Sequence, residues 1–502
     1  MEARASPHRG PSYSQILKST ALIGGSSVIT VLFSIIRNKA MALLLGPAGV
    51  GLIGLYSSIA DIAFSLAGLG IQASGVRQIA EAVGSGDADR IARTATVLKR
   101  TSLVLGLLGA LLLVALAYPV ADFTFGRPGY AGGVALLSAA ILFRLLADGQ
   151  MALIQGMRDI ASLARINVLA AFFSTAIGIP LIYLFGTSGI VASLVAGGAA
   201  SLAICWRFGR QIRLPAPPMS TRQVREEIGS LLKLGFVFMV SGFLTLGAAY
   251  AIRLIVMRAE GIAAAGLYQA AWTLGGFYAS FVLQAMGTDF YPRLTAVAQD
   301  DAECNRLVNE QAQVSMLVAG PGLIATLTAA PLVIRLLYSP EFYAAVDLLR
   351  WICLGMMLRV IAWPMGYIVL AKGAKRAFFW VEVAATVVHL GLAWLLVGSF
   401  GSVGAGAAFF SLYVWHGLLI YAIVRQLSGF RWSAANRKLA LIFLPASALV
   451  FGALFVLPPW PAAVLGLATA MLTGAYSLRV LTEIVPLATL PAALRALRSR
   501  SA

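Results

Sequence analysis

Two basic residues, Arg37 and Lys39, interrupt the first long apolar stretch of the chain, residues 20–45. A later apolar stretch carries Arg253, and Arg258 follows it. A cation in the middle of a membrane-spanning helix costs about 2.5 to 3.5 kcal/mol, so such residues usually face a bundle interior or a water-filled cavity. We therefore expect Arg37 and Arg253 to line a cationic cavity. Lys39 and Arg258 are expected to support them or, alternatively, to extend to the outer membrane interface.

Two further arginines lie in apolar stretches and differ in their sequence neighbours. Arg144 and Asp148 are four residues apart, a spacing that places both on one helix face, where they can neutralise each other as a structural ion pair. Arg359 has Trp363 at the matching position instead of an acid. It therefore requires another partner or an anion, and we include it among the expected substrate-binding residues.

Asp61 is an acidic residue in an apolar stretch with no basic neighbour within one helical turn. It is a candidate for proton or sodium coupling, since ionisable residues inside a membrane often mark ion pathways. The alternative is that Asp61 pairs with Arg37 or Arg253 across a cavity. Three other polar residues could relay protons, although such residues are more often hydrogen-bonded parts of the structure: Glu382, His389 and His416.

The elements that position these residues are membrane-spanning helices. Of the 502 residues, 60% are hydrophobic and 12% are charged, and the mean hydropathy is +0.86, values typical of a polytopic membrane protein. A spanning helix needs about 20 mostly apolar residues. The sequence contains about fourteen such stretches: 20–45, 48–74, 101–121, 131–154, 166–186, 188–208, 231–257, 262–291, 314–337, 345–371, 378–399, 402–425, 438–458 and 461–483. The first is too long for a cleaved signal peptide.

The net charge of +18 is distributed unevenly over the connecting segments. Under the fourteen-helix count, alternate connections hold most of the lysines and arginines, and the opposite ones carry little beyond Arg127. This asymmetry predicts that both termini and the basic connections are cytoplasmic, in a bacterial inner membrane. It argues against nucleic-acid binding and indicates attraction to anionic lipid headgroups as a secondary role. The basic segments are 77–100, 158–165, 207–225, 293–306, 372–376 and 425–438.

An internal repeat relates the two halves of the chain. The sequence Phe-Gly-Thr-Ser-Gly at 185–189 returns as Phe-Gly-Ser-Val-Gly at 400–404, an offset of 215. The same offset relates Arg144 to Arg359 and "GPAGVGL" to "GIAAAGL", and an offset of 216 relates Arg37 to Arg253. An even number of helices in each copy makes the repeats parallel, and substrates of such folds bind at the repeat interface.

The repeat and the charge pattern together predict the domain organisation. Two six-helix bundles, 20–208 and 231–425, are joined by a basic cytoplasmic linker. A further helix pair stands outside the duplication, and short cytoplasmic segments complete the chain. The remaining boundaries are 1–19 for the N-terminus, 209–230 and 426–437 for the linkers, 438–483 for the extra pair and 484–502 for the tail.

Three motifs resemble a known transporter superfamily. The pattern Arg-x₈-Gly-Pro-x-Gly-x-Gly-Leu at 37–52, the Phe-Gly-x-x-Gly turns and "YSPEFYAAVDLLR" at 338–350 resemble the polysaccharide exporters of the multidrug/oligosaccharidyl-lipid/polysaccharide (MOP) superfamily. "LGPAGVGLIGLYSSI" is most similar to the O-antigen translocases, which flip lipid-linked oligosaccharides. Many of these have twelve helices, and the extra pair here is more similar to the lipid II flippases. The resemblance implies a MATE-like V of two bundles around a central cavity.

The resemblance also implies a substrate and a role for the cations. The substrate would be an undecaprenyl-pyrophosphate oligosaccharide, moved from the cytoplasmic to the periplasmic leaflet by alternating access. A guanidinium group binds phosphate oxygens bidentately, so Arg37 and Arg253 are expected to bind the pyrophosphate, with Lys39 and Arg258 in support. Further expected partners are the bilayer, a proton or sodium gradient and the polysaccharide polymerase machinery.

Other functions are less consistent with the sequence. A MATE-type drug antiporter for cations would favour acids in its cavity, and a glycan polymerase or ligase would need a large outward loop. A scaffold of an export complex would not need duplicated cations. The sequence lacks a GxxxxGK[ST] motif, and its three cysteines show no metal-site spacing. We therefore expect a transporter that is not an enzyme and needs no cofactor or metal.

Overall fold

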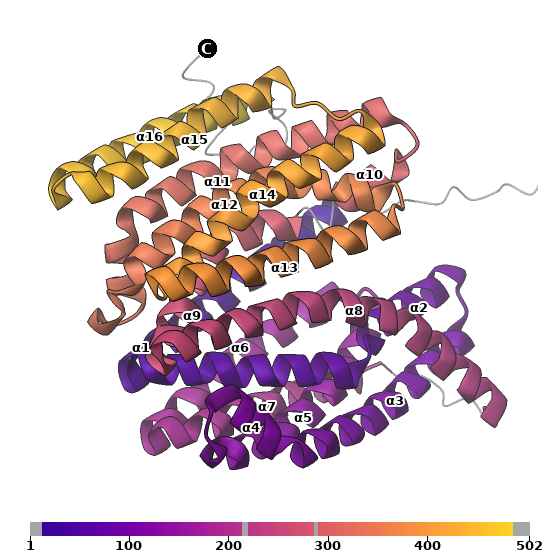
Figure 1. Ribbon diagram of the computed structural model, residues 1–502. Coiled ribbons are helices and arrows are strands. Elements are labelled where there is room, and N and C mark those ends of the chain that lie inside the picture. Colours follow the sequence, from indigo (N-terminus) through magenta and orange to yellow (C-terminus); the bar gives the residue numbers. More distant parts are fainter. Residues whose placement is uncertain (1–12, 213–218, 286–289, 485–502) are drawn as a thin grey trace, which may run out of the picture. The chain divides into compact units, whose positions relative to one another are not determined.

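The computed structural model describes residues 13–212, 219–285 and 290–484, and the regular elements in these ranges are all helices, as predicted (Figure 1). The first half contains α1 (Tyr13–Gly68), α2 (Ile71–Ser85), α3 (Ala88–Ala115), α4 (Ala117–Phe125), η1 (Pro128–Tyr130), α5 (Ala131–Gly156), α6 (Ile160–Phe185), η2 (Gly186–Ser188) and α7 (Gly189–Gly209). The second half contains α8 (Thr221–Glu260), α9 (Ile262–Ala285), α10 (Tyr291–Ala296), α11 (Asp301–Leu337), η4 (Pro340–Phe342), α12 (Ala345–Ala371), α13 (Lys375–Phe400), α14 (Val403–Ser428), α15 (Ala434–Val456) and α16 (Pro459–Ile484).

Helix α1 is long enough to cross a membrane twice. Its apolar part comprises 44 residues. At 1.5 Å per residue this part is about 66 Å long, against a hydrocarbon core of about 30 Å. The backbone leaves helical geometry at Gly46, where φ is 62° and ψ is −170°, directly before Pro47. Glycine adopts positive φ without steric cost, so Gly46 divides α1 into the two spans expected near 20–45 and 48–74.

The number of crossings agrees with the sequence prediction. Eleven segments of the described residues are long and apolar enough to span a membrane. One of them is the bent α1, and another, residues 160–209, contains both α6 and α7. Helix α9 is 24 residues long and carries no charged residue, but it is not among the eleven apolar segments. Counting α1 and residues 160–209 twice each gives thirteen crossings in the described part of a multi-pass membrane protein, and α9 would be the fourteenth expected from the sequence.

The backbone repeats the duplication seen in the sequence. Helix α6 ends at Phe185, and α13 ends 215 residues later at Phe400, with a glycine following each. Residues with positive φ recur at the same offset, which confirms two copies of one helical unit. The equivalent pairs are Gly46 (62°) and Gly261 (90°), Arg158 (58°) and Gly373 (66°), and Gly186 (57°) and Gly401 (63°).

Packing divides the chain into two compact units, but at a different place from the repeat. Of the described residues, unit 1 comprises 13–45, 52–212 and 219–250, and unit 2 comprises 46–51, 251–285 and 290–484. The predicted bundles, 20–208 and 231–425, were separated by the 209–230 linker, whereas the packing boundary falls inside α8 at Tyr250.

Direct contacts explain this difference. The Gln78 amide donates to Ser230 Oγ at 3.0 Å, and the Thr124 and Tyr250 hydroxyls are 2.5 Å apart, so the first part of α8 belongs to unit 1. Residues 46–51 pack within unit 2, where Gly51 and Gly266 bring the backbones of α1 and α9 into close contact.

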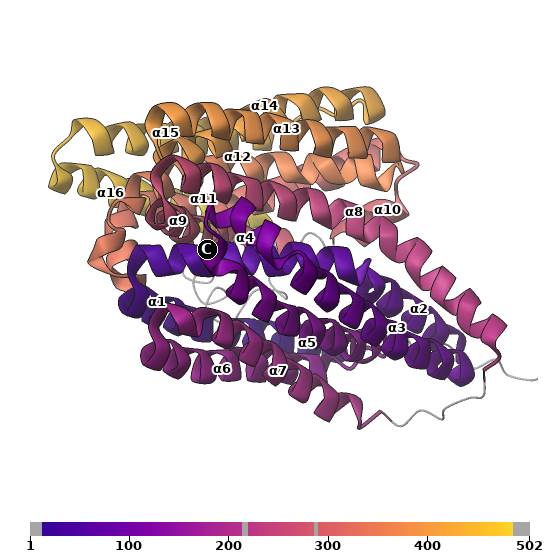
Figure 2. The same cartoon turned by 60° about the horizontal axis from the view of Figure 1, so that its bottom comes forward.

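In unit 1, α5 lies among several other helices. It packs against α2, α3 and α7, and α7 packs in turn against α6. Figure 2 shows α5, α6 and α7 side by side in this unit. Helix α5 carries Arg144 and Asp148, so this bundle positions both groups.

In unit 2, α11 and α12 are central. In the most apolar 18-residue stretch of each helix, 56% and 61% of the residues, respectively, are buried. Arg359, on α12, is therefore inside the unit rather than at its edge. The final pair, α15 and α16, packs against α11 (Figure 1). The Asn436 amide donates to the Asn309 carbonyl at 2.8 Å, and Gly320 faces the Phe443 ring. The extra helix pair is thus an integral part of unit 2.

Candidate functional site

Arg37 is half-buried between α1 and α6. Its Nη1 donates to Ser174 Oγ at 2.9 Å, and the Phe33 and Phe172 rings of the same two helices pack edge to face, 5.6 Å apart. A guanidinium has five N–H donors, and this bond to a neutral hydroxyl uses one of them. Within the described residues, Arg37 thus keeps most of its donors and its full charge available for a ligand. Lys39, two residues further along α1, is also half-buried.

Arg253, the equivalent of Arg37 in the second repeat, is also half-buried and is positioned by a neutral side chain. Its Nε donates to Gln269 Oε1 at 2.8 Å, and Gln269 Nε2 donates to Thr273 Oγ1 at 3.3 Å. Gln269 and Thr273 belong to α9, so α9 orients Arg253 on α8. Arg258 is exposed in the last turn of α8.

Asp61 forms an ion pair with Arg144 in unit 1. Arg144 Nη1 lies 2.5 Å from Asp61 Oδ1, and its guanidinium carbon lies 4.1 Å from the centre of the Phe64 ring. The side chains of Arg144 and Asp61 remain 48% and 39% exposed.

This geometry changes two expectations. Arg144 pairs with Asp61 instead of Asp148, because α1 brings a carboxylate closer to the guanidinium than the next turn of α5 does. Asp148 stays within electrostatic range of Arg144. Asp61 pairs with Arg144 rather than with Arg37 or Arg253.

Arg359 occupies the position equivalent to Arg144, but its surroundings are aromatic. Its guanidinium carbon lies 4.2 Å from the centre of the Trp363 ring and 5.8 Å from that of Tyr413, distances at which cation–π attraction operates. The residue equivalent to Asp61 in this repeat is Gly276. Among the described residues, Arg359 Nε is buried without a hydrogen-bond partner.

Three polar residues that the sequence placed far apart gather around Arg359. Glu382, His389 and His416 are all close enough to interact with its charge. His389 Nε2 and His416 Nδ1 are buried with no hydrogen-bond partner among the described residues. Helices α12, α13 and α14 therefore enclose a polar cluster of one cation, one carboxyl group and two imidazoles.

Sequence reasoning missed the neutral partners Ser174 and Gln269. Gln269 could have been noticed as an isolated amide in the uncharged helix α9. Ser174 offers no comparable signal, because serines are common in apolar helices.

The chain matches known proteins over most of its length. The family described as polysaccharide biosynthesis protein matches residues 40–347. The lipid III flippase of Escherichia coli strain K12 is 24% identical over 410 residues, which cover 80% of this chain and 95% of that protein.

Solved structures share the fold. The lipid II flippase MurJ in an inward closed conformation aligns with a TM-score of 0.66 and 12% identity, over 93% of this chain and all of that one. A MATE-family multidrug transporter of the MOP superfamily in an inward-facing conformation also has a TM-score of 0.66, with 16% identity, over 82% of this chain and 96% of that one. At these identities the likeness shows the fold, which is MATE-like as expected.

Proposed function

Because the chain belongs to the polysaccharide biosynthesis protein family, we propose that it is a flippase for undecaprenyl-pyrophosphate-linked oligosaccharides. The substrate would be an O-antigen or a related polysaccharide repeat unit. It would move from the cytoplasmic to the periplasmic leaflet of the inner membrane by alternating access. The name and coverage of the E. coli relative support the lipid-linked class of substrate.

The observation that carries this proposal is the pair of equivalent arginines, Arg37 and Arg253. Each is half-buried in a membrane-spanning helix, and each has a hydrogen bond to a neutral side chain on a neighbouring helix. Holding a cation in this position is costly, and at Arg37 the neutral Ser174 hydroxyl orients the guanidinium without cancelling its charge. Such a group is suited to an anion that enters and leaves.

The pyrophosphate is the part of the substrate that most resists transfer through hydrocarbon, because its charge must leave water. A guanidinium fork can replace part of that hydration with two parallel hydrogen bonds to phosphate oxygens. We assign pyrophosphate binding to Arg37 and Arg253, with Lys39 and Arg258 in support. Arg359 is a further candidate contact, and the polyprenyl chain would stay in lipid.

The function is tested by reconstitution. Purified protein in proteoliposomes should translocate a fluorescent undecaprenyl-pyrophosphate oligosaccharide. Loss of a hydrogen bond to a charged group costs about 1.5 to 3 kcal/mol, so Arg37→Ala and Arg253→Ala should each slow flipping by about 10- to 150-fold. The matched control is Arg222→Ala, because the Arg222 side chain is 89% exposed and pairs with Glu226 on its own helix.

Two different outcomes would contradict the residue assignment and the proposed function. Normal flipping by the Arg37→Ala/Arg253→Ala double variant at equal abundance would contradict the pyrophosphate site. If the folded wild type moves no lipid-linked oligosaccharide under either a proton or a sodium gradient, but exports a cationic drug, the antiporter alternative replaces the flippase.

A further inference from the structure

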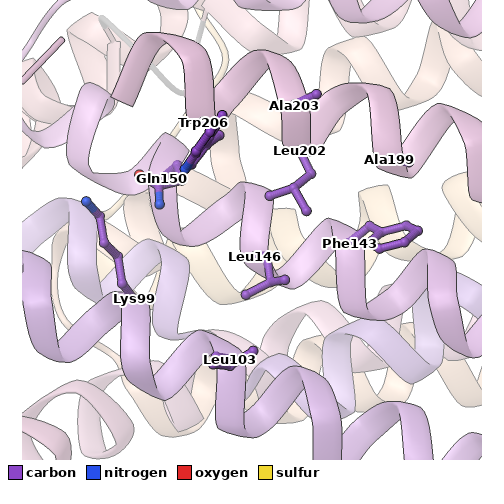
Figure 3. A pocket seen from close by; sticks show the side chains of 9 residues that line it. All are labelled: Lys99, Leu103, Phe143, Leu146, Gln150, Ala199, Leu202, Ala203 and Trp206. Carbon is purple, nitrogen blue, oxygen red and sulfur yellow. The ribbon is translucent and has the colours of Figure 1, made fainter. Parts of the chain in front are cut away.

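A pocket of about 480 Å³ lies within unit 1 between α3, α5 and α7 (Figure 3). Its lining is mainly apolar and includes Leu103, Phe143, Leu146 and Leu202. The Leu103 and Trp206 side chains remain 45% and 51% exposed, so the pocket is open at the surface of the unit rather than sealed inside it. None of the residues assigned to pyrophosphate binding lines this pocket.

The polar groups of the pocket are gathered at one end. Figure 3 shows the Lys99 ammonium group extending toward Gln150 and Trp206, while Leu103, Leu146 and Phe143 line the remainder. Within the described residues, no ion pair or hydrogen bond is recorded for the side chains of Lys99 and Gln150. The pocket therefore combines an uncompensated cation and a free amide with an apolar trough.

A second cation lies beside the polar end. The Arg210 guanidinium carbon is 4.3 Å from the centre of the Trp206 ring, and Arg210 directly follows the last residue of α7. Gly209 leaves room for this arrangement, because a Cβ atom there would lie 2.6 Å from Gln150 Oε1. The polar end of the pocket thus carries two positive charges and an indole ring, the side chain that favours membrane interfaces.

The polar end also lies close to the ends of two of these helices. Gln150 and Trp206 are within two turns of the ends of α5 and α7. The basic segments predicted to be cytoplasmic begin at these same helix ends, at Arg158 and Arg207. A ligand would thus have an anionic group at the level of the lipid headgroups and an apolar part beside the hydrocarbon.

We propose that this pocket binds an anionic phospholipid of the bilayer. Its phosphate would lie against Lys99 and Arg210, with the Gln150 amide donating to a phosphate oxygen. One acyl chain would follow the trough formed by Leu103, Leu146 and Leu202. The ligand is a lipid rather than a soluble anion, because most of the lining is apolar and would be left in contact with water by an ion alone.

Native mass spectrometry of the purified full-length protein tests the site. The delipidated protein is equilibrated with phosphatidylglycerol or with phosphatidylcholine, and the bound lipid is counted. A basic residue near the surface contributes about 1 kcal/mol to the attraction of anionic lipid, so Lys99→Gln should weaken phosphatidylglycerol binding about fivefold. The matched control is Arg100→Gln, which removes the same charge at the adjacent, exposed position outside the pocket and should bind as the wild type does.

A second variant tests the trough separately from the charge. Ala203 lines the pocket and is exposed, so Ala203→Phe should fill the pocket without disturbing the core, and should lower binding as Lys99→Gln does. Equal binding of the two lipids by the wild type would contradict the proposal. So would wild-type binding by Lys99→Gln, or displacement of the lipid by inorganic phosphate. The readout does not depend on flipping, so the result stands apart from the proposed transport function.

Discussion

The equivalent arginines Arg144 and Arg359 differ in the group that faces each guanidinium. Arg144 pairs with Asp61, whereas Arg359 stacks on Trp363 and keeps a buried N–H without a partner in the described structure. A carboxylate can be neutralised by a proton or attracted to a sodium ion, so the pair in unit 1 can open in response to an ion. An indole ring cannot respond in this way. This difference favours Asp61 as the coupling residue.

Asp61→Asn tests this assignment, because it keeps the side-chain shape and removes the charge. We expect flipping under an imposed proton or sodium gradient to slow by about tenfold, since the charged hydrogen bond to Arg144 is worth about 1.5 kcal/mol or more. Flipping measured without a gradient should change little. The control is Asp148→Asn, which removes a second carboxylate near Arg144 that forms no ion pair with any described residue. An equal response of the two variants would show that Asp61 has no special part in coupling.

Sequence reasoning found the residue types at the candidate site but not their partners. Arg37, Asp61 and Arg359 could be identified because charge is rare in apolar stretches. The i, i+4 rule then pointed Arg144 toward Asp148, since that rule describes an isolated helix. In the structure, a carboxylate 83 positions away competes for the same guanidinium and lies 2.5 Å from it. Such pairings depend on how helices pack, which the local spacing of residues does not record.

Among the helices, the contact between α1 and α9 imposes the strictest limit on side-chain size. A Cβ atom on Gly51 would clash with the Ile262 carbonyl, and one on Gly266 would clash with the Pro47 carbonyl. Residues 47 and 51 are related to 262 and 266 by the repeat offset of 215, so the contact is reciprocal. The glycines that revealed the repeat in the sequence are thus required by close packing of two backbones.

Substituting these glycines should destabilise the protein. Gly51→Ala and Gly266→Ala each place a methyl group against a carbonyl that cannot rotate away, and overpacking of this kind costs about 1 to 3 kcal/mol. The check is the thermal unfolding temperature in detergent, which should fall in both variants. Gly242→Ala is the control, because nothing lies within 4 Å of a Cβ at that position of α8. An unchanged unfolding temperature for Gly51→Ala would show that this contact does not contribute to stability.

For the molecule as a whole, the helix count, the duplication and the extra helix pair were all accessible from the sequence, because hydropathy and glycine spacing persist over the entire chain. The packing boundary was not. The repeat places the start of the second copy at residue 231, yet Gly235 packs its backbone against Leu69 and Gly70 in unit 1. A sequence repeat reflects how the chain was duplicated, whereas a packing unit is defined by tertiary contacts. One long helix, such as α8, can therefore contribute residues to both units.

The distribution of basic residues predicts which face of the molecule is cytoplasmic, and this determines the direction of the proposed transport. A single introduced cysteine can show by its labelling which side of the membrane it lies on, because the three native cysteines are buried. These are Cys205, Cys304 and Cys353. Arg127 and Tyr343 are exposed beside η1 and η4, in connections predicted to lie outside. Asp89 and Lys375 are exposed at the starts of α3 and α13, on the side predicted to be cytoplasmic.

A membrane-impermeant maleimide applied to intact cells should therefore label Arg127→Cys and Tyr343→Cys. It should label Asp89→Cys and Lys375→Cys only after the membrane is opened. Labelling by a permeant maleimide controls for intrinsic reactivity at all four positions. The reversed pattern would place the basic segments outside, contrary to the positive-inside rule, and would overturn the proposed direction from cytoplasm to periplasm. Because Arg127 and Tyr343 come from different repeats, labelling of both from one side would also support parallel insertion of the two copies, as an even helix count requires.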